Sequence, residues 1–271
     1  MNRLLDRPLR GMLSAFSRPA CQPLLETLQR AVLAGMNIGP AGDPLSSGEV
    51  HVLRYCARLW PVNGSWVIFD AGARQGAYAL LASSVLGPSC RVYCFEPSRA
   101  SFQQLAARAA RAPNLQAYNL GLGEAEGEVT LYSDEPGSGI ASVYPRRLEH
   151  HGLSLRAQEV IRVRTLDAVR QQLGVARIQL LKLDIEGHEL RALQGARQSL
   201  EEAAIDCIQF EFGGCNIDSR TYLRDFFELL SQRYRLYRVL RRGLYELPGY
   251  REIYESFLTA NYLAVAQGLT A

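Results

Sequence analysis

The chain has 271 residues, of which 48% are hydrophobic, and its formal net charge is +3. This length and composition allow one large domain with a sizeable core. The weak positive charge gives no support for nucleic-acid binding, and no apolar run approaches the about 18 residues that a membrane span needs.

Three helices are predicted before the main domain. The first, within residues 1–16, is amphipathic with arginines on its polar face, and Pro8 interrupts it. Such a face packs on its own domain more often than on an anionic membrane, so peripheral membrane contact is the lesser alternative. The other two helices span residues 24–34 and 49–59, and we assign residues 1–60 to a helical cap and 61–271 to the main domain. The apolar face of the first helix consists of Leu4, Leu5, Leu9, Met12, Leu13 and Phe16.

Residues 66–97 predict a strand, a glycine-containing turn, a helix and a second strand. The apolar run 67–69 ends at Asp70, and Gly72 and Gly76 follow; a glycine lets the backbone turn tightly and approach a ligand closely. The second strand ends at Glu96, whose carboxylate can accept two hydrogen bonds from a ribose diol. A purely structural turn would use the glycines only for close packing, but the paired acids favour a nucleotide-cofactor site. The spacing D-x-G-x-x-x-G differs from G-x-G-x-x-G and so disfavours NAD.

Two further side chains are candidates for cofactor contact. Glu49 begins the third helix, where the helix dipole would explain a carboxylate equally well. Asn119 follows a third strand, 115–118, and its amide can both donate to and accept from an adenine, although capping a turn is an equal alternative.

A long polar segment, 133–159, lies between two β-rich stretches, 128–132 and 160–164. Loops of this length in compact domains tend to be lids or binding loops, so we expect this one to cover a substrate. A helix is predicted over 166–174.

The fourth and fifth parallel strands are predicted at 178–183 and 206–212, with a helix over 188–203 between them. Lys182, which is the only lysine of the chain, shares one side of the fourth strand with Asp184 and Glu186. The end of a central strand faces the ligand crevice of an α/β sheet. The fifth strand carries Gln209 and Glu211; a buried Glu211 requires Lys182 or an arginine as partner, or else binds substrate.

The C-terminal region predicts a helix over 221–232, a strand over 234–240, a turn around Gly243 and a last strand over 261–266. The alternation of strands and helices before it indicates an α/β fold. Six cysteines lack any C-x-x-C or Cys/His ligand spacing, so we expect buried free thiols and a cytoplasmic protein.

The segment 66–76 with Glu96 resembles a class I S-adenosylmethionine-dependent methyltransferase. More of the chain, from about residue 35 to 265, resembles the FkbM methyltransferase family. The resemblance implies a Rossmann-like fold with a mostly parallel seven-stranded sheet of order 3-2-1-4-5-7-6 and helices on both faces. One departure is Arg74, where the family often has Asn; a left-handed residue there would make Arg a costly choice, or Arg74 reaches a substrate anion. The segments that carry the resemblance are Asn119-Leu-Gly-Leu-Gly, Thr165-Leu-Asp, Leu181-Lys-Leu-Asp-Ile-Glu-Gly-His-Glu and Gln194-Gly-Ala.

The resemblance also implies S-adenosylmethionine as cofactor and O-methylation of a hydroxyl on a sugar, glycan or secondary metabolite. Transfer from a sulfonium requires near-attack geometry and a group that accepts the hydroxyl proton. We take Asp184, Glu186, His188 and Lys182 as the candidate catalytic residues, with the general base divided between Asp184 and His188.

Three alternatives have less support. A hard-metal site of Asp184, Glu186, His188 and Glu211 is disfavoured because the wider ligand pattern is missing, so no metal is expected. A non-catalytic binding module with the same fold has only Arg74 in its favour, and an NAD-linked dehydrogenase ranks third.

Overall fold

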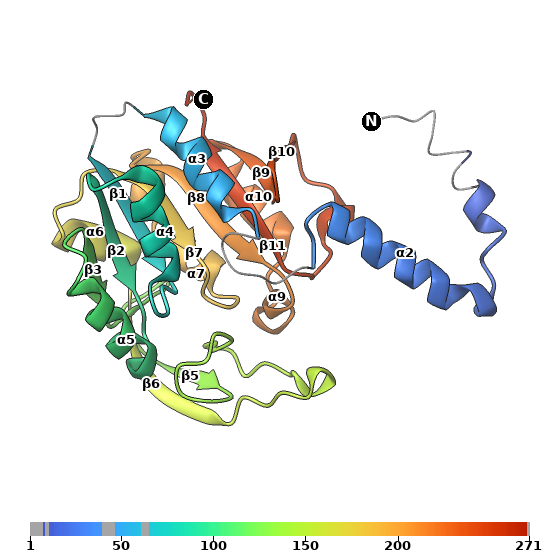
Figure 1. The fold of residues 1–271 in the computed structure, drawn as a ribbon, viewed down its shortest axis with the longest axis horizontal. Coiled ribbons are helices and arrows are strands. Elements are labelled where there is room, and N and C mark those ends of the chain that lie inside the picture. The colour runs from blue at the N-terminus through green and yellow to red at the C-terminus, as the bar shows by residue number, and fades with distance from the viewer. Residues whose placement is uncertain (1–7, 9–10, 40–46, 61–64, 270–271) are drawn as a thin grey trace.

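The computed structural model describes residues 8, 11–39, 47–60 and 65–269. Its centre is an eight-stranded sheet (Figure 1). Five parallel strands form one half, and an antiparallel group completes the other. The strands are β1 Trp66–Ala71, β2 Cys90–Phe95, β3 Leu115–Tyr118, β7 Ile178–Leu183, β8 Ile205–Phe212, β9 Tyr234–Leu240, β10 Gly243–Leu247 and β11 Ala260–Ala266.

The strand order is β3-β2-β1-β7-β8-β11-β9-β10. Its first seven strands have the predicted order 3-2-1-4-5-7-6, so the class I fold is confirmed. The eighth strand, β10, was not predicted. Gly243, with φ +140°, closes a hairpin in which β10 pairs antiparallel with β9. The β10 sequence is short and includes the exposed Tyr245 and the charged Glu246, so its pattern does not distinguish an edge strand from a loop.

Helices cover both faces of the sheet (Figure 1). The predicted helix over 188–203 is in fact two, because the chain turns at Gly195, where a Cβ would lie 2.0 Å from the Gly123 carbonyl oxygen. The helices are α2 Gln22–Gly35, α3 Glu49–Leu59, α4 Ala77–Leu86, α5 Arg99–Ala109, α6 Leu166–Gln172, α7 Glu189–Gln194, α8 Arg197–Glu201, α9 Cys215–Ser219 and α10 Leu223–Leu230, with 3-10 turns η1 Pro19–Cys21, η2 Glu149–His151 and η3 Glu252–Tyr254.

Two hydrophobic cores lie on opposite faces of the sheet. Successive residues of β1 point to opposite sides, so Ile68 packs with α3, α4 and α5 while Phe69 packs with α6, α7, α8 and α10. Both side chains are fully buried, as expected for a parallel strand covered on both faces. The six cysteines are free and five are buried, in agreement with the expected free thiols.

A second, three-stranded sheet lies beside the carboxyl end of the main one, in the order β4 Gly121–Leu122, β6 Ala157–Arg164, β5 Gly127–Ser133. It frames the segment between β5 and β6, which folds back through a bridge between Tyr132 and Ser142. The predicted β-rich stretches are thus β5 and β6, the antiparallel pair that the long loop connects.

Two helices of the predicted N-terminal cap, α2 and α3, differ in their packing. Helix α3 buries Val52, Leu53 and Cys56 against the sheet, whereas α2 buries none of its residues and projects away from the domain (Figure 1). Within the described ranges, no helix is both long and apolar enough to cross a bilayer. Of the predicted apolar face, Met12, Leu13 and Phe16 are exposed, and Leu4, Leu5 and Leu9 lie outside the described residues.

Candidate active site

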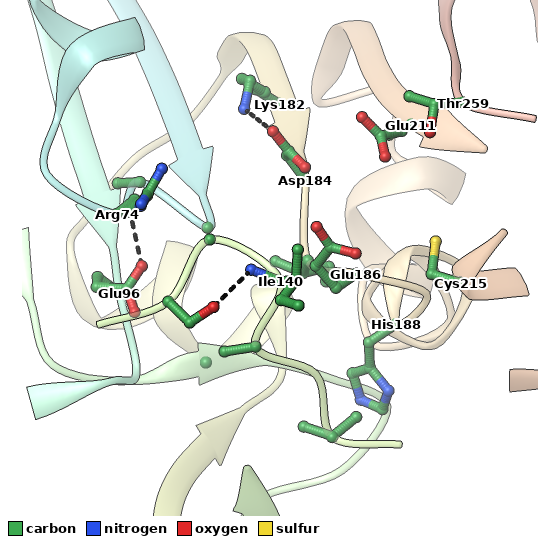
Figure 2. Close-up of a pocket in the computed structure, with 18 of the residues that line it drawn as sticks. Arg74, Glu96, Ile140, Lys182, Asp184, Glu186, His188, Glu211, Cys215 and Thr259 are labelled. Carbon is green, nitrogen blue, oxygen red and sulfur yellow. Dashed lines mark hydrogen bonds and ion pairs between the residues drawn. The ribbon is translucent and has the colours of Figure 1, made fainter. Parts of the chain in front are cut away.

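A cavity of about 950 Å³ opens at the carboxyl ends of the parallel strands, where open α/β sheets bind ligands. In Figure 2, Arg74 and Glu96 lie on one side of it, with Asp184, Glu186 and Glu211 toward the other. Seven of the ten predicted site residues line this cavity: Glu49, Gly72, Glu96, Lys182, Asp184, Glu186 and His188.

The turn after β1 can be built only with glycine at position 72. Gly72 has φ +78°, and a Cβ there would lie 1.8 Å from the backbone oxygen of Asp184. The backbone of this turn therefore reaches the cavity directly. Gly76 directly precedes α4 and has φ +83°. It packs close to Leu105 of α5 and does not line the cavity. Its role is to turn the chain into the helix.

Glu96 joins the ends of β1 and β2. Its carboxylate accepts the backbone N–H of Arg74 at 2.8 Å and that of Ser98 at 2.9 Å. Each oxygen keeps a second lone pair, so the carboxylate can still accept ribose hydroxyls. Burial raises the pKa of Glu96 to about 7 despite these two bonds. Together with the Cβ-free backbone at Gly72, this arrangement fits a nucleoside cofactor.

Asp70 lies beneath the cavity rather than in its wall. Its side chain is fully buried, neither carboxylate oxygen has a hydrogen-bond partner in the described part of the chain, and one oxygen is 3.8 Å from Lys182 Nζ. Burial raises the pKa of Asp70 to about 6, although Lys182 opposes this. The structure therefore places Asp70 where it acts on the cavity through Lys182.

Lys182 links this buried acid to the cavity. Its ammonium donates to Asp184 Oδ2 at 2.9 Å and lies 4.9 Å from the ring centre of Tyr78. Burial alone would lower the pKa of Lys182, but Asp184, Asp70 and Glu49 together raise it, so the side chain is cationic. Its main effect is to hold the Asp184 carboxylate in place.

Glu49 reaches the cavity because Gly48, with φ +96°, lets α3 begin close against β9. Its carboxylate accepts from Ser47 Oγ at 3.0 Å and from Gln209 Nε2 at 2.7 Å. Gln209 Oε1 in turn accepts the Tyr78 hydroxyl at 3.0 Å. This chain of bonds explains the polar Gln209 in the otherwise apolar β8.

Asn119 lies outside the cavity wall. Its amide nitrogen donates to the backbone oxygens of Glu96 and Pro97, both at 2.9 Å, so these bonds fix the end of β2. Only its carbonyl oxygen is left to accept from an adenine amine.

Three carboxylates, Asp184, Glu186 and Glu211, converge on the opposite side of the cavity, with oxygens within 4.8 Å of one another. Glu186 pairs with Arg146 at 2.5 Å. Burial and then Asp184 raise the pKa of Glu186 to about 7, with Arg146 opposing. Burial, Asp184 and Glu186 likewise raise the pKa of Glu211 well above its usual value. The same three groups could hold a cation, and His188 is not among them.

Glu211 forms no ion pair with Lys182 or with an arginine of the described residues, although the sequence suggested such a partner. It faces the cavity with the other two carboxylates. Of the two predicted roles for Glu211, substrate contact is the one that this position favours.

His188 contacts the long loop. Its Nδ1 lies 3.0 Å from the Tyr144 hydroxyl, and burial lowers the pKa of His188 to about 4. The imidazole is therefore neutral near pH 7 but too weakly basic to be an efficient proton acceptor there. The assignment of the general base to Asp184 or His188 stays a prediction.

Sequence reasoning missed four residues that shape the site. Ser142, Tyr144 and Arg146 come from the loop after β5, and Ser142 Oγ donates to the backbone oxygen of Glu186 at 2.7 Å. The fully buried Glu189 accepts from the backbone N–H groups of Ile185 and Gly187 at 2.9 and 3.2 Å. It thus holds the turn in which Glu186 has φ +51°. Glu189 could have been found from the sequence, because it ends the segment Leu181–Glu189 that carries the family resemblance. No sequence pattern pointed to the three loop residues.

Comparison with known proteins agrees with this geometry. Residues 70–239, more than half of the chain, match the model of the methyltransferase FkbM domain. The AMB antimetabolite synthetase AmbE of Pseudomonas aeruginosa is 32% identical over 51% of this chain and 8% of its own length. The hexuronic acid methyltransferase AglP of Haloferax volcanii is 25% identical over 61% of this chain and 64% of its own length. The chain thus spans less than two thirds of either relative.

Among solved structures, the O-methyltransferase TomG from Streptomyces achromogenes, in complex with S-adenosylmethionine, covers 82% of this chain and 81% of its own at 13% identity and a TM-score of 0.44. The family match begins within β1 and ends within β9, and it includes Asp70, Glu96 and the three carboxylates Asp184, Glu186 and Glu211. The chain belongs to the FkbM methyltransferase family, and its cofactor is S-adenosylmethionine.

Proposed function

We propose that this methyltransferase transfers its methyl group to a hydroxyl oxygen of a sugar or of a sugar-like natural product. The observation that carries the proposal is the cluster of Asp184, Glu186 and Glu211 facing Glu96 and the glycine turn across one cavity. An alcohol needs a nearby group to accept its proton, and carboxylates serve this purpose when their pKa is near the working pH. The name of the relative AglP supports a sugar acid as acceptor, and that of AmbE supports a natural product.

S-adenosylmethionine, when bound, supplies a methyl group on a sulfonium sulfur; a C–O bond forms as the C–S bond breaks. We assign the proton to Glu186, because burial raises its pKa to about 7 and because its carboxylate faces the cavity. Asp184, held by Lys182, and Glu211 are assigned to binding the acceptor hydroxyls. His188 and Tyr144 are assigned to positioning the long loop over the acceptor.

The test is methyl transfer from labelled S-adenosylmethionine to a panel of uronic acids, neutral sugars and amino sugars. The wild type should label a hydroxyl oxygen, located by NMR. Glu186→Gln should reduce turnover by about 100-fold or more, the contribution typical of a general base. Glu228→Gln, a change at an exposed residue of α10, is the matched control. Labelling of an amine, or cofactor binding with no transfer to any acceptor, would contradict the proposal.

A further inference from the structure

We propose that Arg74 binds a carboxylate in the cavity: either the α-carboxylate of S-adenosylmethionine or the carboxylate of an acidic acceptor. The inference rests on the proposed function, because it takes the cavity to hold this cofactor and its acceptor.

The backbone at Arg74 does not favour an arginine. Its φ is +48°, in the left-handed region where Asn is tolerated and most other side chains are strained by about 1 kcal/mol or more. The turn itself needs only the backbone N–H of residue 74, which donates to Glu96 at 2.8 Å (Figure 2). Any residue other than proline would supply that bond, so the guanidinium is not required for the turn.

The side chain of Arg74 extends toward the loop between β5 and β6. A Cβ built at Gly139 would lie 2.9 Å from Arg74 Nη1, so the loop backbone passes close to the guanidinium. Both residues line the cavity. The charged group therefore lies between the cofactor wall at Glu96 and the loop predicted to cover the acceptor.

The other cations of the cavity wall already have acidic partners. Arg146 pairs with Glu186 and Asp218, and Lys182 pairs with Asp184 and Asp70. The guanidinium of Arg74 makes no hydrogen bond or ion pair with any residue that the structure describes. It is thus the cation that an entering anionic ligand can reach without breaking an existing pair.

A carboxylate is the anion that suits this position. The planar guanidinium can donate two parallel hydrogen bonds to a carboxylate, which a lysine cannot do. Glu49, Glu96 and Glu211 also line the cavity and offer a carboxylate ligand no cation, while Arg146 and Lys182 are already paired with acids. Because Arg74 lies between the two binding regions, either ligand can bring that carboxylate.

Calorimetric titration of Arg74→Asn separates the two sources. Asn suits the left-handed backbone, so the variant should fold at least as stably as the wild type. Arg220→Asn is the matched control, since Arg220 is also exposed, has φ +55° and lies outside the cavity wall.

If Arg74 binds the cofactor carboxylate, Arg74→Asn should weaken S-adenosylmethionine about 10- to 100-fold and leave 5′-methylthioadenosine, which lacks the carboxylate, unchanged. If it binds the acceptor, cofactor affinity should stay the same, and a uronic acid should lose the same factor while a neutral sugar does not. Arg74→Lys should restore only part of either loss.

Equal binding of all four ligands by the wild type and Arg74→Asn would overturn the inference. If the wild type binds neither S-adenosylmethionine nor 5′-methylthioadenosine, the proposed function is overturned, and the inference with it. The two failures are distinguished by the wild-type titration alone.

Discussion

The two sides of the cavity are built by different means. On the cofactor side, backbone contacts shape the site: the backbone around Gly72 leaves no room for a Cβ, and two backbone N–H groups hold Glu96. On the acceptor side, polar side chains contact partners from a distant loop, as in the ion pair of Arg146 with Glu186 and the hydrogen bond between Tyr144 and His188.

This difference separates what the fold determines from what a loop can change. The backbone contacts of the cofactor side join strands of one sheet, so a substitution there disturbs the sheet as well as the site. The acceptor side depends on side chains that are 40 residues apart in the chain, such as Arg146 and Glu186. A loop can alter these contacts without altering the sheet, which favours one cofactor with varied acceptors.

The largest expected effect is that of Gly72→Ala on the cofactor side. The added Cβ would lie 1.8 Å from the Asp184 oxygen, so the turn must shift, and a displacement of about 1 Å can cost 100-fold in function. Calorimetry should show at least that loss of S-adenosylmethionine affinity. Gly87→Ala is the control, because Gly87 also has a positive φ of +84° but has nothing within 4 Å of the added atom. Equal binding by both variants would refute the contrast between the two sides.

The next effect concerns the charge of Glu96. Glu96→Gln keeps a hydrogen-bond acceptor but removes the negative charge that strengthens bonds to the ribose, so S-adenosylmethionine affinity should fall about 10- to 100-fold. Glu128→Gln, at an exposed position of β5, should not change affinity. An unchanged dissociation constant for Glu96→Gln would remove Glu96 from the cofactor site.

A pH profile tests the acceptor side. If the unprotonated Glu186 accepts the hydroxyl proton, and its pKa is about 7, then kcat/KM should fall as the pH drops below about 7 and approach a tenfold loss per pH unit. Cofactor affinity measured in parallel is needed, because burial also raises the pKa of Glu96 to about 7. A flat profile between pH 5 and pH 8 would contradict the assignment of Glu186.

The smallest effect is expected for the loop contact. Tyr144→Phe removes the hydroxyl that lies 3.0 Å from His188 Nδ1, a neutral bond worth about 1 kcal/mol. The acceptor KM should rise about fivefold, while S-adenosylmethionine affinity stays the same. Tyr245→Phe, on the exposed edge strand β10, is the control. A loss of cofactor affinity in Tyr144→Phe would show that the two sides are not independent.

The same contrast explains how much could be predicted from the sequence. The cofactor side is local: the apolar run before Asp70, the two glycines and Glu96 all fall within residues 67–96, so the strands and their polar ends were predicted correctly. The position of Asp70 was not predictable, because it depends on Lys182 of β7, which lines the cavity and lies 3.8 Å from the Asp70 carboxylate.

On the acceptor side, the strand β7 and its polar end were predicted, but the loop partners were not. The pairing of Arg146 with Glu186 depends on how a polar loop folds over the sheet, and no periodic pattern records that. The break between α7 and α8 has a similar origin, since it depends on the approach of Gly123, which is 72 residues from Gly195.

The single lysine allows one position in the cavity wall to be labelled for spectroscopy. Lys182 is the only lysine in the 271-residue chain, and only 4% of it is exposed. Reductive methylation with ¹³C-formaldehyde would therefore place a single side-chain label in the protein, next to Asp184. The neutral amine is the form that reacts, and Asp184, Asp70 and Glu49 hold Lys182 in its cationic form, so labelling of the folded protein should be slow.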